Sequence, residues 1–148
     1  MSEREDLVSA ALAWQGRFGC APAITSAISE HDAALLVGHD DASYAHDCVN
    51  RTAVSQGYDF TLGRLRYQVK ANRPSGKPGS FVTLVAKARN YDWDRLVWIL
   101  YDREYVLLEA WEWNVDAYRA SFDGKKRLSP RDMRSGRRLF PYAEKSAA

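Results

Sequence analysis

Apolar residues near the start of the chain recur with helical spacing. A helix is predicted for residues 3–18, because three- and four-residue intervals separate the apolar side chains Leu7, Ala11, Trp14 and Phe18. Gly19 supplies its stop signal. A second helix is predicted for residues 26–37, with Thr25 or Ser26 as its N-cap and Gly38 after its last turn.

The middle of the chain has the patterns of strands and loops. Residues 39–56 are polar and predict a long connection with one short strand inside it. Residues 58–70 alternate between apolar and polar positions, which predicts a β-hairpin. Two Pro and two Gly between residues 71 and 79 favour a basic loop. Residues 81–88 fit a strand or a helix, and their periodicity does not decide between them.

The later elements are more sharply marked. Residues 96–101 form a continuous apolar run, as expected for a strand covered on both faces, and residues 105–113 are its predicted hairpin partner. A last helix is predicted for residues 115–122. Ser129 and Pro130 have the pattern of a further helix start. Helices at both ends and strands between them predict an α+β, three-layer α/β/α fold.

Composition and charge narrow the class of protein. The 148 residues suit one domain, with 46% hydrophobic residues to fill its core and a basic segment at 123–148. No apolar run is long enough to span a membrane and no secretory signal is seen, which favours a cytoplasmic protein. Cys20 and Cys48 stand far apart, so reduced thiols and no zinc site are expected. Residues 1–60 carry a net charge of −6 and residues 61–148 carry +8. This asymmetry fits a polyanion-binding surface or an ordinary solvated basic face.

The hairpin carries the most informative chemistry. A two-residue turn at Gly63-Arg64 would place the apolar residues on one face. Asp59 would then stand opposite Gln68 on the other face, about 5 Å away at Cβ, with Lys70 two residues further along. Carboxylate and carbonyl oxygens suit a hard cation such as Mg²⁺, with Mn²⁺ as a substitute. A neighbouring Lys can orient a water and offset charge on a phosphorane, so the trio predicts phosphodiester hydrolysis.

Asp59, eight intervening residues and then Gln68-Val69-Lys70 resemble the PD-(D/E)XK signature of the restriction-endonuclease-like superfamily. The resemblance implies a restriction-endonuclease-like αβββαβ core with a central mixed sheet of four to five strands and the motif on the second and third strands. It also implies Mg²⁺-dependent hydrolysis of nucleic-acid phosphodiesters by Asp59, Gln68 and Lys70, with the Val69 backbone carbonyl as a further metal ligand. Gln68 stands where the family usually has Glu or Asp, and no Pro precedes Asp59.

A helix acid often completes such a site, and Glu30 is the natural candidate. It lies at the edge of the apolar stripe of the second helix, where a carboxylate is costly without a partner. Alternatively, it is an ordinary first-turn acid favoured by the helix dipole. Asp32 is the second choice.

Basic and aromatic residues offer candidate nucleic-acid contacts. The cations predicted to bind phosphates are Arg66, Arg73, Lys77, Lys125, Lys126 and Arg127. The basic segment 125–138 also fits a solvated, partly disordered tail. Four tryptophans suggest core packing or a dimer interface more readily than base stacking: Trp93, Trp98, Trp111 and Trp113.

Three hypotheses follow. The first is a metal-dependent DNA endonuclease, with RNA not excluded, that acts as a homodimer on duplexes and uses no organic cofactor. The second is a catalytically silent nucleic-acid-binding or protein-interaction module on the same fold. The third is a general α+β domain whose polar hairpin face is merely solvated.

Overall fold

A mixed, open, five-stranded sheet forms the middle layer of the protein in the computed structural model, which describes residues 2–51 and 57–142. The strands are β1 (Phe60–Leu62), β2 (Leu65–Asn72), β3 (Arg95–Tyr101), β4 (Leu107–Asn114) and β5 (Arg137–Phe140). They lie side by side in chain order, and only the β2–β3 pair is parallel. The helices are α1 (Glu3–Phe18), α2 (Thr25–Val37), α3 (Asp41–Asn50), α4 (Val115–Phe122) and α5 (Pro130–Met133).

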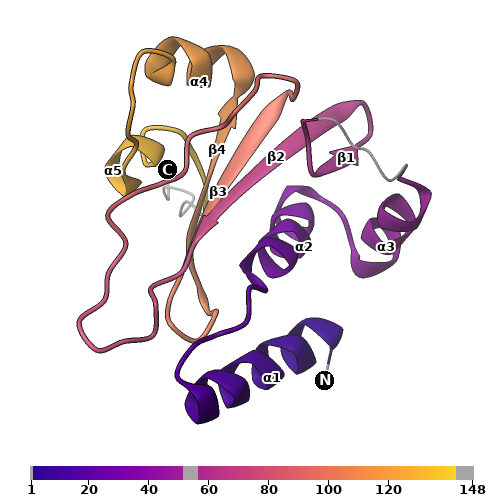
Figure 1. The fold of residues 1–148 in the computed structure, drawn as a ribbon. Coiled ribbons are helices and arrows are strands. Elements are labelled where there is room, and N and C mark those ends of the chain that lie inside the picture. Colours follow the sequence, from indigo (N-terminus) through magenta and orange to yellow (C-terminus); the bar gives the residue numbers. More distant parts are fainter. Residues whose placement is uncertain (1, 52–56, 143–148) are drawn as a thin grey trace, which may run out of the picture.

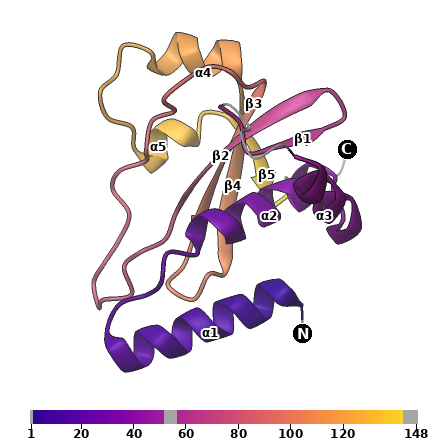
Figure 2. The same cartoon turned by 45° about the vertical axis from the view of Figure 1, so that its right-hand side comes forward.

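Helices cover the two faces of the sheet unequally (Figures 1 and 2). On one face, α2 packs Ile28, Ala33 and Ala34 against Tyr67, Val69 and inward-facing residues of β3. On the other face, α4, α5 and the connection between β2 and β3 enclose a second core that contains Leu96 and Trp98. Successive strand residues point to opposite faces, so each central strand serves both cores.

Several predicted elements are confirmed. α1 and α4 have the predicted bounds, and α2 begins one residue before the predicted start. The hairpin, the apolar strand β3 and its partner β4 are present. Ser129 caps α5 and Pro130 is its first residue, as the sequence indicates. The α+β class and the mixed sheet are therefore correct.

Other predictions were wrong. Residues 41–50 form helix α3 rather than part of an irregular connection, because Asp40 and Ser43 make a reciprocal capping box; residues 52–56 of that prediction lie outside the described residues. Residues 81–88 are neither strand nor helix and make one isolated bridge, Val85 with Leu128. The alternative of a partly disordered tail at residues 125–138 was also wrong, because this basic segment contributes α5 and strand β5 to the fold. Residues 143–148 lie outside the described residues.

The placement of the motif also differs from the expectation. Asp59 directly precedes the first described strand and Gln68-Val69-Lys70 lies on the second, instead of on the second and third strands. Within the described residues, every helix falls short of the length and apolar character that crossing a membrane requires.

Candidate metal and phosphate site

From Phe60 to Tyr67, the hairpin register agrees with the prediction made from its apolar residues. Phe60 pairs with Tyr67 and Leu62 pairs with Leu65, so the turn falls at Gly63-Arg64. Gly63 has a φ of 59°, which a glycine adopts without strain. The stacked rings of Phe60 and Tyr67 lie 4.9 Å apart between centroids and anchor the hairpin in the α2 core.

Asp59 lies where this ladder ends. Its backbone N–H donates to the Tyr67 carbonyl at 2.7 Å, and its carboxylate accepts the Val69 N–H at 2.7 Å. The carboxylate thus occupies the position along β2 at which a longer β1 would offer a backbone carbonyl. The predicted cross-strand pairing of Asp59 with Gln68 is therefore wrong, because the β1–β2 pairing begins only at Phe60 and the Asp59 carboxylate binds the Val69 N–H.

Glu30 approaches the same place from α2. Burial raises the pKa of the Glu30 carboxyl to about 7, and the negative charge of Asp59 adds to this effect. The nearby Arg51 guanidinium opposes the rise but does not cancel it. Two half-buried carboxylates in such proximity repel each other, so without a cation they favour a shared proton. The Glu30 carboxyl is therefore a neighbour of the Asp59 carboxyl.

Gln68 and Lys70 flank the residue that Asp59 contacts. Tyr67 and Val69 belong to the α2 core, so alternation directs Gln68 and Lys70 to the opposite face of β2. Both are partly exposed. Glu30, on α2, and the pair Gln68–Lys70 thus lie on opposite faces of β2, and the Asp59 carboxylate lies at the edge of this strand.

The Val69 carbonyl completes this edge. In an antiparallel pair, the N–H and the C=O of one residue point to the same side of the strand. The Val69 N–H points to Asp59, and so its carbonyl points to that side as well. Among residues 2–51 and 57–142, no strand pairs with β2 beyond Tyr67 on this side.

Helix α3 fixes the neighbouring strand β1. The Thr61 hydroxyl donates to the Asp47 carboxylate at 2.7 Å, and its backbone N–H contacts the same side chain. His39 Nε2 lies 2.7 Å from the Thr61 carbonyl. Side chains therefore cover the outer edge of β1, which protects it from pairing with another chain.

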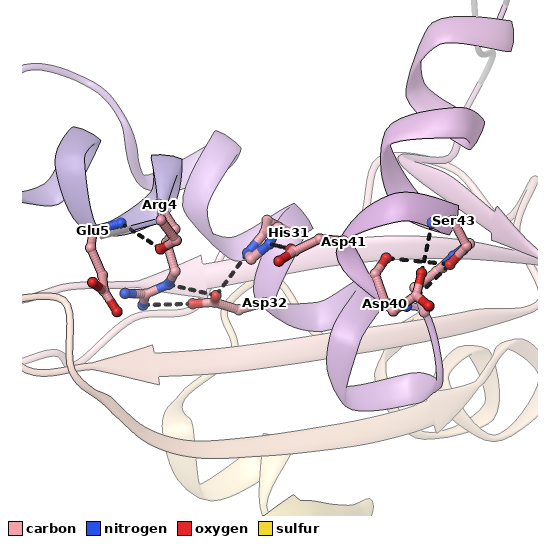
Figure 3. Close-up of polar contacts among 9 residues, drawn as sticks. Arg4, Glu5, His31, Asp32, Asp40, Asp41 and Ser43 are labelled. Atoms are coloured by element: carbon pink, nitrogen blue, oxygen red, sulfur yellow. Dashed lines mark hydrogen bonds and ion pairs between the residues drawn. The ribbon is translucent and has the colours of Figure 1, made fainter.

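Asp32, the alternative helix acid, has other partners. Its carboxylate accepts two hydrogen bonds from the Arg4 guanidinium, at 2.7 and 2.8 Å, and one from the Tyr101 hydroxyl at 2.6 Å. Figure 3 shows the Arg4–Asp32 pair next to His31, which also contacts Asp41. These contacts fasten α1 to α2 and the sheet, so Asp32 has a structural role.

The predicted phosphate-binding cations fall into two groups. Arg66 forms an ion pair with Asp94, and the Arg73 guanidinium donates to the Arg103 carbonyl and to Gln15 while stacking 4.3 Å over Tyr105. Lys125 contacts Asp132. Lys77, Lys126 and Arg127 are exposed and have no ion-pair partner among the described residues, whereas Arg66 and Lys125 are exposed but paired.

The oxygen donors at the edge of β2 suit one hard cation. They comprise the Glu30 and Asp59 carboxylates and the Val69 carbonyl, which are ligand types that Mg²⁺ prefers, whereas the Gln68 side chain points to the opposite face of β2 from Glu30. Within the described part of the chain, no three acidic, His or Cys side chains converge on one point, so neutral oxygens would have to complete the shell. No protein-family model matches the sequence, and no curated protein is significantly similar to it.

Proposed function

We propose that this protein is a Mg²⁺-dependent nuclease that hydrolyses DNA phosphodiester bonds at the edge of β2. The observation that carries the proposal is that the Glu30 and Asp59 carboxylates meet beside Val69, where burial and then the Asp59 charge raise the pKa of Glu30 to about 7. Such a pair gains from exchanging its proton for a divalent cation. The resemblance to the PD-(D/E)XK signature supports the same reading.

Each residue has a distinct task in this proposal. Glu30, Asp59 and the Val69 carbonyl hold the cation, and Gln68 reaches round the open edge from the other face of β2 to add a neutral oxygen. Bound there, Mg²⁺ supplies Lewis-acid polarisation of a phosphoryl oxygen and a lower pKa for a bound water. The Lys70 ammonium donates to the phosphate and offsets the negative charge that grows during attack. Lys77, Lys126 and Arg127 attract the polyanionic backbone.

A second candidate function rests on Gln68. A neutral amide in place of a carboxylate removes one negative charge from the ligand set, which weakens metal affinity. A domain that binds nucleic acid without cutting it would tolerate this loss.

Plasmid nicking distinguishes these candidates. Wild-type protein should nick supercoiled DNA in Mg²⁺ or Mn²⁺, and Lys70→Ala should abolish nicking without changing the thermal unfolding midpoint. Lys87→Ala is the matched control, because the Lys87 ammonium binds the carbonyls of Asp123 and Lys125 instead of the site. Salt-sensitive DNA binding without nicking in either metal would favour the second candidate. If the protein neither binds nor nicks DNA, both candidate functions are overturned.

A further inference from the structure

A cavity of about 450 Å³ opens on the same face of the sheet as Lys70. Its walls come from the connection between β2 and β3, from strands β3 and β4, and from the start of α5. In Figure 1 this connection descends from β2 and returns past α5 towards α4. Phe81, Leu100 and Leu108 give the cavity an apolar lining, and Arg131 gives it a charged wall.

The cavity lies close to the proposed cleavage site. Leu100 pairs with Asn72, which is two residues beyond Lys70 on β2. With a rise of about 3.3 Å per residue and about 4.8 Å between strands, the Cα atoms of Lys70 and Leu100 are about 8 Å apart. Leu100 packs against the second core, with Leu96 and Trp98, and therefore faces the side to which Lys70 points. A ligand in the cavity would be a near neighbour of a phosphate at Lys70.

Phe81 is held in an exposed position. The side chain is 76% exposed, which leaves most of an aromatic ring in water. The loop before it is fastened by the Ser80 hydroxyl, which accepts hydrogen bonds from the Ser75 N–H and hydroxyl, each at 3.0 Å. After it, the Asn72 amide donates to the Leu84 carbonyl at 3.0 Å. Contacts on both sides of Phe81 thus fix the segment that presents the ring.

The charge of the cavity favours an anionic occupant. Among the described residues that line it, two are arginines and none is acidic. Arg134 is neutralised by Glu109 at 2.6 Å, whereas Arg131 is exposed. Lys77 lies four residues before Phe81 in the same loop. An aromatic surface beside cations is the arrangement with which proteins stack unpaired bases and hold their phosphates.

We infer that this cavity binds an unpaired nucleobase, stacked on Phe81, from a nucleotide next to the phosphate at Lys70. The inference rests on the proposed nuclease function and specifies its substrate as single-stranded or locally unpaired DNA. An intact duplex offers no base to the cavity, because its bases are paired and stacked. The protein should therefore bind single strands more tightly than duplexes of the same length.

Fluorescence with 2-aminopurine tests the inference in the full-length protein. Single-stranded oligonucleotides that carry this base, and matched duplexes, are titrated without divalent metal so that cleavage does not interfere. Binding to the wild type should quench the single-strand signal. Phe81→Ala should weaken single-strand binding about 5- to 150-fold, the range found for loss of one stacked base, and should remove the quenching. Phe81→Trp should restore both.

Leu84→Ala is the matched control. Leu84 is 56% exposed in the same segment but does not line the cavity, so its truncation should change single-strand affinity by less than about 2-fold. Equal effects of Phe81→Ala and Leu84→Ala, or unchanged quenching in Phe81→Ala, would overturn the inference even if the protein nicks DNA. Tight single-strand binding that depends on Phe81, without nicking in Mg²⁺ or Mn²⁺, would support base binding by the cavity and refute the proposed nuclease activity. Absence of single-strand binding by the wild type would overturn the inference.

Discussion

Replacing Glu30 by Gln tests the central contact of the site through protein stability. In the metal-free protein the pKa of Glu30 is raised from 4.5 to about 7, first by burial and then by the Asp59 charge. Because the folded-state pKa lies above the unfolded one, protonation of Glu30 stabilises the fold. That contribution is complete below about pH 4.5 and is lost as the pH rises through about 7.

The size of the effect follows from the shift. A change from 4.5 to about 7 corresponds to about 3 kcal/mol for a fully buried group. Glu30 is only half-buried, so solvent screening reduces the expected value to about 1–2 kcal/mol. Glu30→Gln removes the charge at every pH. Relative to the wild type, the variant should therefore gain about 1–2 kcal/mol in its free energy of unfolding between pH 4.5 and pH 8.

Urea unfolding of both proteins in a chelating buffer measures this difference at pH 4.5, 6 and 8. Glu104→Gln is the control, because Glu104 lies exposed in the β3–β4 turn and its variant should show no such trend. At pH 8, added Mn²⁺ should stabilise the wild type but not Glu30→Gln. A difference between wild type and Glu30→Gln that stays constant across this pH range would refute the reasoning.

Three further predictions concern other parts of the molecule. Gln68→Glu should lower the Mg²⁺ concentration at half-maximal nicking about 10-fold or more by restoring a ligand charge, and an unchanged midpoint would show that Gln68 is not a ligand. Asp32→Ala should cost about 2–4 kcal/mol in urea unfolding because Arg4 and Tyr101 lose their shared partner, whereas the exposed Asp41→Ala should cost less than about 1 kcal/mol. Gly136→Ala should lower the thermal midpoint by several degrees, since its Cβ would lie 2.5 Å from Trp113 Nε1, while Gly124→Ala meets no atom within 4 Å and should be nearly neutral.

The sequence predicted best where local pattern and packing agree. The apolar alternation of the hairpin set its register, and the continuous run at residues 96–101 identified a strand buried on both faces. Helix α3 was not predicted because none of its residues is buried and polar side chains occupy half of its ten positions. Its capping box, Asp40 with Ser43, was the available signal. Strand β5 escaped because two exposed arginines occupy half of its four residues and only β4 makes it a strand.

For the candidate site, the sequence supplied the residue types but not their orientation. Glu30 and Asp59 are 29 positions apart, and their contact depends on how α2 packs on the hairpin. The strand period placed Asp59 opposite Gln68, but that rule applies only inside a ladder. At position 59 the ladder has ended, and the carboxylate binds the Val69 N–H in place of a backbone carbonyl. Periodicity cannot show where a strand stops pairing.

The shortness of β1 is therefore the feature that creates the site. Had β1 begun two residues earlier, its backbone would occupy the edge of β2 and would take up both the N–H and the carbonyl of Val69. Because β1 begins at Phe60, the Asp59 side chain satisfies the N–H, and the carbonyl of the same residue faces the edge where Glu30 arrives from α2. This edge gathers two carboxylates and a backbone carbonyl, and the Val69 N–H and the nearby Arg51 guanidinium offset their charge only in part. A proton shared by the two carboxylates relieves their repulsion below about pH 7, and under the proposed function a divalent cation would take the place of this proton at higher pH.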